Sequence, residues 1–157
     1  IASRYGRSAQ LDTFLMTNIS PQKPKLNQKL WQRLEEVISD KLSKKYGDLW
    51  VFTGPIFNDS RETLKRSKVI IPAAFYKIIV RTDPNKKITR TLSFVMPQNV
   101  SGKESLLKFV RSIDEIEALT HIDFLHELDD SIENIVESST NLEAWDIKPY
   151  ANLPSRY

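Results

Sequence analysis

The sequence predicts an α+β fold in a single domain, residues 1–157, and three observations support this. An amphipathic helix is expected at 27–44. Two strand-like segments, 69–81 and 88–96, are joined by a turn, so the sheet is at least partly antiparallel. Capping-box patterns then indicate shorter helices, and no Gly/Ser-rich linker divides the chain.

The helix at 27–44 is predicted from apolar residues that recur at helical spacing. Lys41, Lys44 and Lys45 fall in its last turn, where cations suit the helix dipole, and Gly47 follows as a stop signal. The apolar positions are Leu30, Trp31, Leu34, Val37, Ile38 and Leu42.

The strands are predicted from β-branched and aromatic residues bounded by turn residues. An extended stretch at 10–19 ends at Ser20-Pro21, and Leu49–Thr53 is expected to be a short buried strand closed by Gly54-Pro55. Because proline cannot donate to a ladder, Pro72 is expected at a strand start or on an edge strand.

Further helices are expected after the hairpin. Capping boxes at Ser101–Glu104 and Ser112–Glu115 open two of them, which reach about Phe109 and Leu119. A third is expected at 128–138. Its inward residues are predicted to be Ile132, Ile135 and Val136. The last residues, 147–157, either wrap the surface or contact a second subunit.

Composition restricts the function classes. The 157 residues contain no cysteine, so disulfides, cysteine metal sites and a cysteine nucleophile are excluded. No apolar run approaches the roughly 18 residues that span a bilayer. Residues 1–112 hold 21 Lys/Arg against 9 Asp/Glu, and 113–157 hold 2 against 11. A basic front favours a polyanionic partner such as nucleic acid; a solvated surface with segregated charges is the alternative.

Three polar residues around the start of the first helix carry the chemistry: Asn18, Asn27 and Glu35. Asn27 and Glu35 fall on one side of the helix, about 80° apart. Their oxygens suit Mg²⁺, with Asn27 as a direct ligand and Glu35 holding a metal-bound water. The alternative is structural: Asn27 as an N-cap, Glu35 solvated or in an i,i+4 pair, and Asn18 bracing a turn.

This segment resembles the DNA/RNA non-specific endonuclease family, of the ββα-metal or His-Me finger type. Further blocks, up to about residue 128, are similar to the family. The first block comprises Thr17-Asn18-Ile19-Ser20-Pro21-Gln22, Leu26-Asn27, Trp31 and Leu34-Glu35, and the others are Thr53–Phe57, Ile71–Lys77, Leu92–Pro97, and Ser112–Glu117 with Leu119-Thr120.

The resemblance implies a central, largely antiparallel sheet flanked by helices, with the N-terminal strands missing from this chain. It implies that Asn27 binds Mg²⁺ directly, that Glu35 binds through water, and that Asn18 orients the catalytic loop. Mn²⁺ or Ca²⁺ can substitute, and no organic cofactor is expected. It further implies hydrolysis of DNA and RNA phosphodiester bonds to 5′-phosphate ends, with a His as general base.

The sequence departs from the family pattern at two places. The signature Asp-Arg-Gly-His block is absent and by spacing belongs upstream of Ile1, so the segment with the catalytic His is expected to be supplied from there. His121 and His126 lie outside any such motif and are expected to be surface or packing residues; His121 falls where relatives commonly have Gly. Ser39 stands where many relatives carry an Arg that faces phosphates, and Lys25, Lys41 and Arg4 are candidate substitutes.

Three functions remain open from the sequence. The first is the Mg²⁺-dependent endonuclease completed by an upstream segment. The second is a catalytically inactive relative that kept the fold and binds nucleic acid. The third is a toxin or inhibitor-controlled nuclease, with the acidic part from Asp114 onward as a binding surface. The resemblance favours an exported protein, either periplasmic or secreted. It also implies a possible homodimer, because several members of the family are homodimers.

Overall fold

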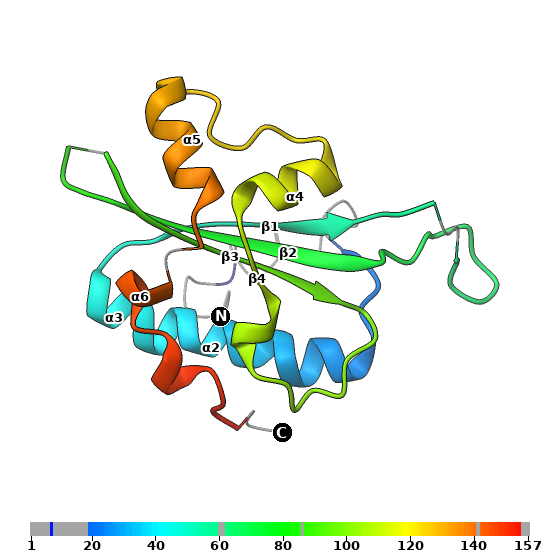
Figure 1. Cartoon of the computed structure of the whole chain (residues 1–157). Coiled ribbons are helices and arrows are strands. Elements are labelled where there is room, and N and C mark those ends of the chain that lie inside the picture. The colour runs from blue at the N-terminus through cyan, green and yellow to red at the C-terminus, as the bar shows by residue number, and fades with distance from the viewer. Residues whose placement is uncertain (1–6, 8–18, 60–61, 86, 141, 155–157) are drawn as a thin grey trace.

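A four-stranded antiparallel sheet with helices on both faces forms the fold of the computed structural model (Figure 1). The structure describes residues 7, 19–59, 62–85, 87–140 and 142–154. The strand expected at 10–19 lies outside these residues except for Ile19, and Asn18 lies outside them too. Among the described residues, no helix is long and apolar enough to cross a membrane. The expected α+β class is confirmed.

The strands follow chain order across the sheet: β1 (Trp50–Ile56), β2 (Ala74–Thr82), β3 (Ile88–Pro97) and β4 (Val110–Arg111). All neighbours are antiparallel. The hairpin of β2 and β3 was therefore predicted correctly. Its first strand begins at Ala74 rather than at residue 69, because Pro72 cannot donate to the ladder.

The expectation for β1 was wrong in two respects. The strand is not buried: the exposed fractions of Trp50, Val51 and Phe52 are 62%, 42% and 40%. It also continues through Gly54 and Pro55, because β1 is an edge strand of the described sheet and an edge tolerates a missing donor. Gly54 is needed there, since a Cβ would lie 2.7 Å from the Tyr76 hydroxyl oxygen.

The expected helix at 27–44 is confirmed as a continuous helical stretch. It consists of η3 (Leu26–Trp31), α2 (Gln32–Val37), η4 (Ile38–Leu42) and α3 (Ser43–Tyr46), of which η3 and η4 are π-helical. It ends at Gly47, whose φ of 82° suits a residue without a side chain. Its predicted apolar face is buried.

Alternation along β2 divides the molecule into two cores. Phe75 and Ile79 face the long helix, where they pack with Leu30, Leu34 and other buried residues. The opposite side chains of β2 pack with α4 (Ile113–Thr120) and the segment after it. Figure 1 shows the long helix below the sheet and α4 with α5 (Asp130–Ser138) above it. These opposite-facing residues are Ala74, Tyr76, Ile78 and Val80.

One capping box was predicted correctly and the other only in part. Ser112 and Glu115 form the complete reciprocal pair that starts α4. Glu104 instead accepts from the backbone N–H groups of Ser101 and Gly102 at 2.7 and 2.9 Å, and so closes a loop. The 3₁₀ turn η5 (Leu106–Phe109) begins only after that loop.

The inward face expected for the helix at 128–138 was wrong for Ile132 and Ile135 and correct for Val136. In α5, Ile132 and Ile135 are 47% and 72% exposed, and Val136 is only partly buried. The most buried residue of α5 is instead a carboxylate, Glu137, at 5% exposure. This helix contacts the sheet at Val136, whose carbonyl accepts from the Thr91 hydroxyl at 3.2 Å, and it buries the acidic Glu137 next to that contact.

The C-terminal segment wraps the long-helix side of the molecule. It comprises α6 (Leu142–Trp145) and η6 (Lys148–Tyr150). Trp145, Ile147 and Ala151 are fully buried in the helix-side core. The Trp145 indole N–H donates to the Thr91 carbonyl at 2.7 Å. Of the two expectations for 147–157, the described part confirms the first.

Candidate active site

Asn27 and Glu35 line one open depression on the long helix, together with Gln28 and Gln32. Asn27 is exposed and Glu35 is half-buried. The two residues that the sequence placed on one side of the helix thus share a surface accessible to a ligand. The alternative for Asn27 as an N-cap is wrong, because its backbone N–H already donates to the Lys23 carbonyl at 2.9 Å, inside the helix.

Glu35 is held from the sheet rather than by a helical neighbour. The Lys77 ammonium of β2 lies 3.8 Å from a Glu35 carboxylate oxygen. The Lys77 side chain is only 5% exposed, whereas that of Glu35 is 37% exposed. The pair therefore joins a buried cation to a carboxylate that still reaches solvent. The i,i+4 alternative does not describe Glu35, and the solvated alternative holds only in part, since the carboxylate is both solvent-accessible and paired with Lys77.

Trp31 completes this support. Its ring centroid lies 4.4 Å from the Lys77 ammonium nitrogen, a cation–π contact, and 5.8 Å from the Phe75 ring centroid. Burial lowers the pKa of Lys77, and the nearby Glu35 carboxylate opposes that change. The spacing of Asn27, Trp31 and Glu35 along the helix therefore has a structural reason. Asn27 lines the open depression, whereas Trp31 and Glu35 both contact the buried Lys77 ammonium.

The donors of this depression fit a hydrated hard cation. A carboxamide oxygen and a carboxylate oxygen are available at an open surface, which leaves room for the waters that Mg²⁺ retains. The ammonium of Lys77 takes up one side of Glu35 and limits the direct approach of a cation there. This arrangement favours Asn27 as the direct ligand and Glu35 as an acceptor from water.

The remaining predicted residues are distributed as follows. Asn18 lies outside the described residues, and so does Arg4. Ser39 donates to an Asp40 carboxylate oxygen at 3.1 Å and supplies no positive charge. Lys25 and Lys41 are exposed.

The two histidines lie away from the depression. His121 and His126 are exposed, and both follow α4, on the opposite face of the sheet. His121 caps the end of α4 with a φ of 57°, a left-handed conformation that favours glycine. Glycine would adopt this conformation without strain.

Lys77 is the site residue that the sequence interpretation missed. The available signal was a lone cation among strand formers, between Phe75 and Ile79, at a position whose side chain must point inward. A buried lysine requires a partner, and the carboxylate of Glu35 was the candidate on the facing helix.

The antiparallel sheet and the long helix packed on it have the arrangement of a ββα-metal nuclease fold. A family model described as DNA/RNA non-specific endonuclease matches residues 2–131, and the chain belongs to this family. A solved structure, the crystal structure of the EndoG/EndoGI complex, matches with a TM-score of 0.64 and 26% identity over 75% of this chain and 52% of that chain.

Curated relatives carry nuclease names. The chain is 31% identical to a nuclease of Nostoc sp. over 82% of its own length and 48% of that protein. It is 30% identical to mitochondrial endonuclease G of Homo sapiens over 78% of its own length and 44% of that protein. The chain thus spans about half the length of the curated relatives it matches.

Proposed function

We propose that this chain is the metal-binding portion of a Mg²⁺-dependent endonuclease that hydrolyses DNA and RNA to 5′-phosphate ends. The observation that carries the proposal is the shared depression of Asn27 and Glu35, with Glu35 held by the buried Lys77. A bound Mg²⁺ would neutralise charge on the phosphate and on the leaving oxygen. The general-base histidine is proposed to come from a segment upstream of Ile1.

The residues of this chain would divide the work. Asn27 would offer its carboxamide oxygen to the ion, and Glu35 would accept hydrogen bonds from the water shell of the ion. Lys77 and Trp31 would keep Glu35 in place, since the ammonium lies close to both the carboxylate and the ring. Asn18 is proposed to orient the catalytic loop. Because only phosphate is addressed, little sequence preference is expected.

The apolar edge of the sheet formed by the described residues suits an additional strand. β1 is an edge strand of the described sheet, and its Trp50, Val51 and Phe52 are exposed. Apolar side chains in a row on an edge strand favour pairing with a further strand. We therefore propose that the upstream segment adds strands next to β1 as well as the histidine.

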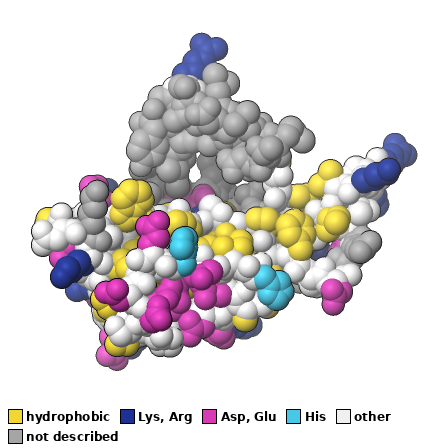
Figure 2. All heavy atoms as spheres, turned by 90° about the horizontal axis from the view of Figure 1, so that it is seen from above, with side chains coloured by type: hydrophobic (Ala, Val, Ile, Leu, Met, Phe, Trp, Pro, Cys, Tyr) yellow, Lys and Arg dark blue, Asp and Glu magenta, His cyan; other side chains and the backbone are white. Residues whose placement is uncertain are grey.

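The charge distribution supports a nucleic-acid partner on the helix side. Lys23, Lys25 and Lys29 lie at the start of the long helix, near Asn27 in sequence. Acidic residues gather instead on the α4/α5 face, in the view of Figure 2. A phosphate backbone would be attracted to the first surface and repelled by the second. Export and homodimer formation remain proposals from the family resemblance.

A cleavage assay on the full-length protein tests this proposal. Supercoiled plasmid and single-stranded RNA would both be cut with Mg²⁺ and left intact with EDTA. Asn27→Ala should lower the rate at least about 100-fold, because it removes the direct ligand. Asn134→Ala, the matched control in α5 on the opposite face, should cleave like wild type. Absence of Mg²⁺-dependent cleavage by the folded full-length protein would exclude the proposal.

A non-catalytic relative that binds nucleic acid is the second candidate. Ser39 favours this second candidate. It stands where the family resemblance implies an Arg that faces phosphates, and its hydroxyl supplies no positive charge. This candidate predicts salt-sensitive binding of DNA and RNA without cleavage. Cleavage that depends on Asn27 would exclude this candidate.

A further inference from the structure

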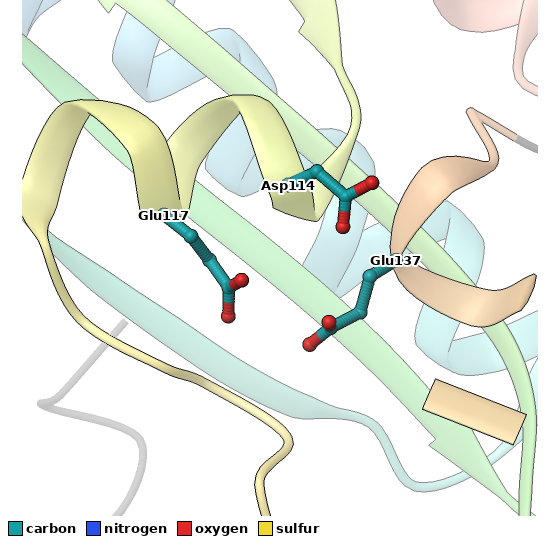
Figure 3. Close-up of side chains that lie close together, drawn as sticks. All are labelled: Asp114, Glu117 and Glu137. Carbon is teal, nitrogen blue, oxygen red and sulfur yellow. The ribbon is translucent and has the colours of Figure 1, made fainter. Parts of the chain in front are cut away.

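Three carboxylates meet on the face of the sheet opposite to Asn27. Asp114 and Glu117 extend from α4, and Glu137 extends from α5. Figure 3 shows the three side chains directed toward one another across the gap between the two helices. One carboxylate oxygen of each lies within 4.8 Å of the other two. Residues far apart in the chain thus bring like charges together.

The burial of Glu137 is a second and separate observation. The residue is 5% exposed, and among the described residues its Oε1 has no hydrogen-bond partner. An unpaired buried carboxylate is strongly unfavourable, so such a group calls for a cation or a proton. Burial, and then the Glu117 and Glu133 carboxylates, raise the pKa of Glu137 to about 7.

The charged groups that act on Glu137 are carboxylates rather than cations. Asp123 and Glu133 add further carboxylates around Glu137. None of the ion pairs formed by the described residues includes Asp114, Glu117 or Glu137. Residues 113–157 contain only two Lys or Arg, of which Lys148 is exposed. The protein therefore supplies little positive charge from this region.

We propose that Asp114, Glu117 and Glu137 bind a divalent cation of the Ca²⁺ type, which ties α5 to α4. Oxygens that are each about 2.3–2.6 Å from one ion are at most about 5 Å apart, and the three carboxylates meet this condition. Ca²⁺ accepts several carboxylates in variable geometry. Mg²⁺ prefers one or two carboxylates and keeps its waters.

The surroundings of the site indicate a structural role. α5 presents Ile132 and Ile135 to solvent, so few apolar contacts hold it on the sheet. Glu117 also accepts from the Phe124 backbone N–H at 2.7 Å, which fixes the loop between the helices. A cation at the three carboxylates would join α4, this loop and α5 into one unit. This site is distinct from the depression at Asn27.

The test measures Ca²⁺ binding and thermal unfolding in the full-length protein. All measurements use the full-length Asn27→Ala variant as the parent protein. This variant lacks the proposed direct ligand of the catalytic ion, so that ion should not contribute to the binding heat or to Tm. After EDTA treatment and dialysis at pH 7.5, CaCl₂ or MgCl₂ is titrated by calorimetry. One Ca²⁺ per chain should bind more tightly than Mg²⁺. Saturating Ca²⁺ should raise Tm by about 5 °C.

Three variants in this parent locate the site. Glu137→Gln should abolish the Ca²⁺ binding event and the rise in Tm. Asp114→Asn changes an exposed ligand, so it is expected to fold, and it should weaken Ca²⁺ binding at least about 10-fold. Glu143→Gln, an exposed acidic residue of α6 outside the cluster, is the control and should bind Ca²⁺ like the parent.

The outcomes are decisive in both directions. The proposal is overturned if the parent shows no Ca²⁺-dependent heat or change in Tm. It is also overturned if Glu137→Gln and Asp114→Asn bind Ca²⁺ as the parent does. Because the parent lacks Asn27, failure here leaves the proposed nuclease function untouched, and loss of cleavage in Asn27→Ala leaves this site untouched.

Discussion

Each face of the sheet buries an ionisable side chain, but the two side chains have opposite kinds of neighbour. On the long-helix face, Lys77 is buried but meets the Glu35 carboxylate and the Trp31 ring. On the α4/α5 face, Glu137 is equally buried but meets Asp114 and Glu117, which carry the same charge. The first group of charges is balanced by the chain itself. The second requires a cation or protons from solution.

This difference separates two uses of burial. The Lys77–Glu35 pair fixes a carboxylate at an open surface, where it remains accessible at 37% exposure. The acidic cluster would fix two helices relative to each other only once the proposed cation is bound. A buried charge with a partner orients a functional group, whereas a buried charge without one makes stability depend on solution conditions.

Among the predicted substitutions, removal of the Glu35 carboxylate should have the largest effect on cleavage and stability. Glu35→Ala in the full-length protein should lower Mg²⁺-dependent cleavage about 100-fold, because the water shell of the ion loses its acceptor. It should also lower the free energy of unfolding by about 1–2 kcal/mol, because Lys77 stays buried without its carboxylate. Plasmid nicking and urea denaturation measure the two effects.

A second substitution separates these two effects. Glu35→Ala combined with Lys77→Met should regain most of the stability, since an apolar side chain then replaces the unpaired ammonium. Cleavage should stay low. Recovery of cleavage in the double variant would mean that Glu35 acts only by keeping Lys77 neutralised.

A change at Glu137 should have the next largest effect, which depends on pH. In metal-free protein, Glu137 has a pKa of about 7, against an ordinary value of 4.5. The folded state therefore binds the extra proton, and the contribution of Glu137 to stability falls as pH rises from about 4.5 to about 7. Asp114, Glu117, Asp123 and Glu133 are the carboxylates that face it.

Glu137→Gln should consequently stabilise the metal-free protein above pH 7 by about 2 kcal/mol. The difference from wild type should vanish below pH 4.5, where both side chains are neutral. Thermal unfolding in EDTA across pH 4 to 8 measures it. A variant that is less stable than wild type at pH 8 would show that the Glu137 carboxylate has a favourable partner.

The smallest effect is expected at the end of α4. His121→Gly should stabilise the protein by about 0.5–1 kcal/mol, because His121 adopts a φ of 57°, which glycine reaches without strain. Cleavage should be unchanged, since His121 is exposed on the face opposite to Asn27. A large loss of cleavage in a stably folded variant would contradict the assignment of His121 as a capping residue.

Local patterns in the sequence predicted much of the fold. The long helix, the hairpin and the Ser112 capping box rest on interactions between residues near in sequence, and all three are present. The exposure of β1 was missed because edge and interior strands have similar sequences. The inward face of α5 was missed in part because Ile132 and Ile135 point to solvent, while Val136 packs on the core and Glu137 is buried beside it.

The sequence by itself determined the family and the pairing of Asn27 with Glu35, because ordered motifs and helical spacing are properties of the linear chain. Only the tertiary structure revealed Lys77 behind Glu35 and the meeting of Asp114, Glu117 and Glu137. These contacts join distant segments, and which charges they bring together depends on how the helices pack on the sheet. Periodicity specifies which face a residue occupies, but it does not specify what lies opposite.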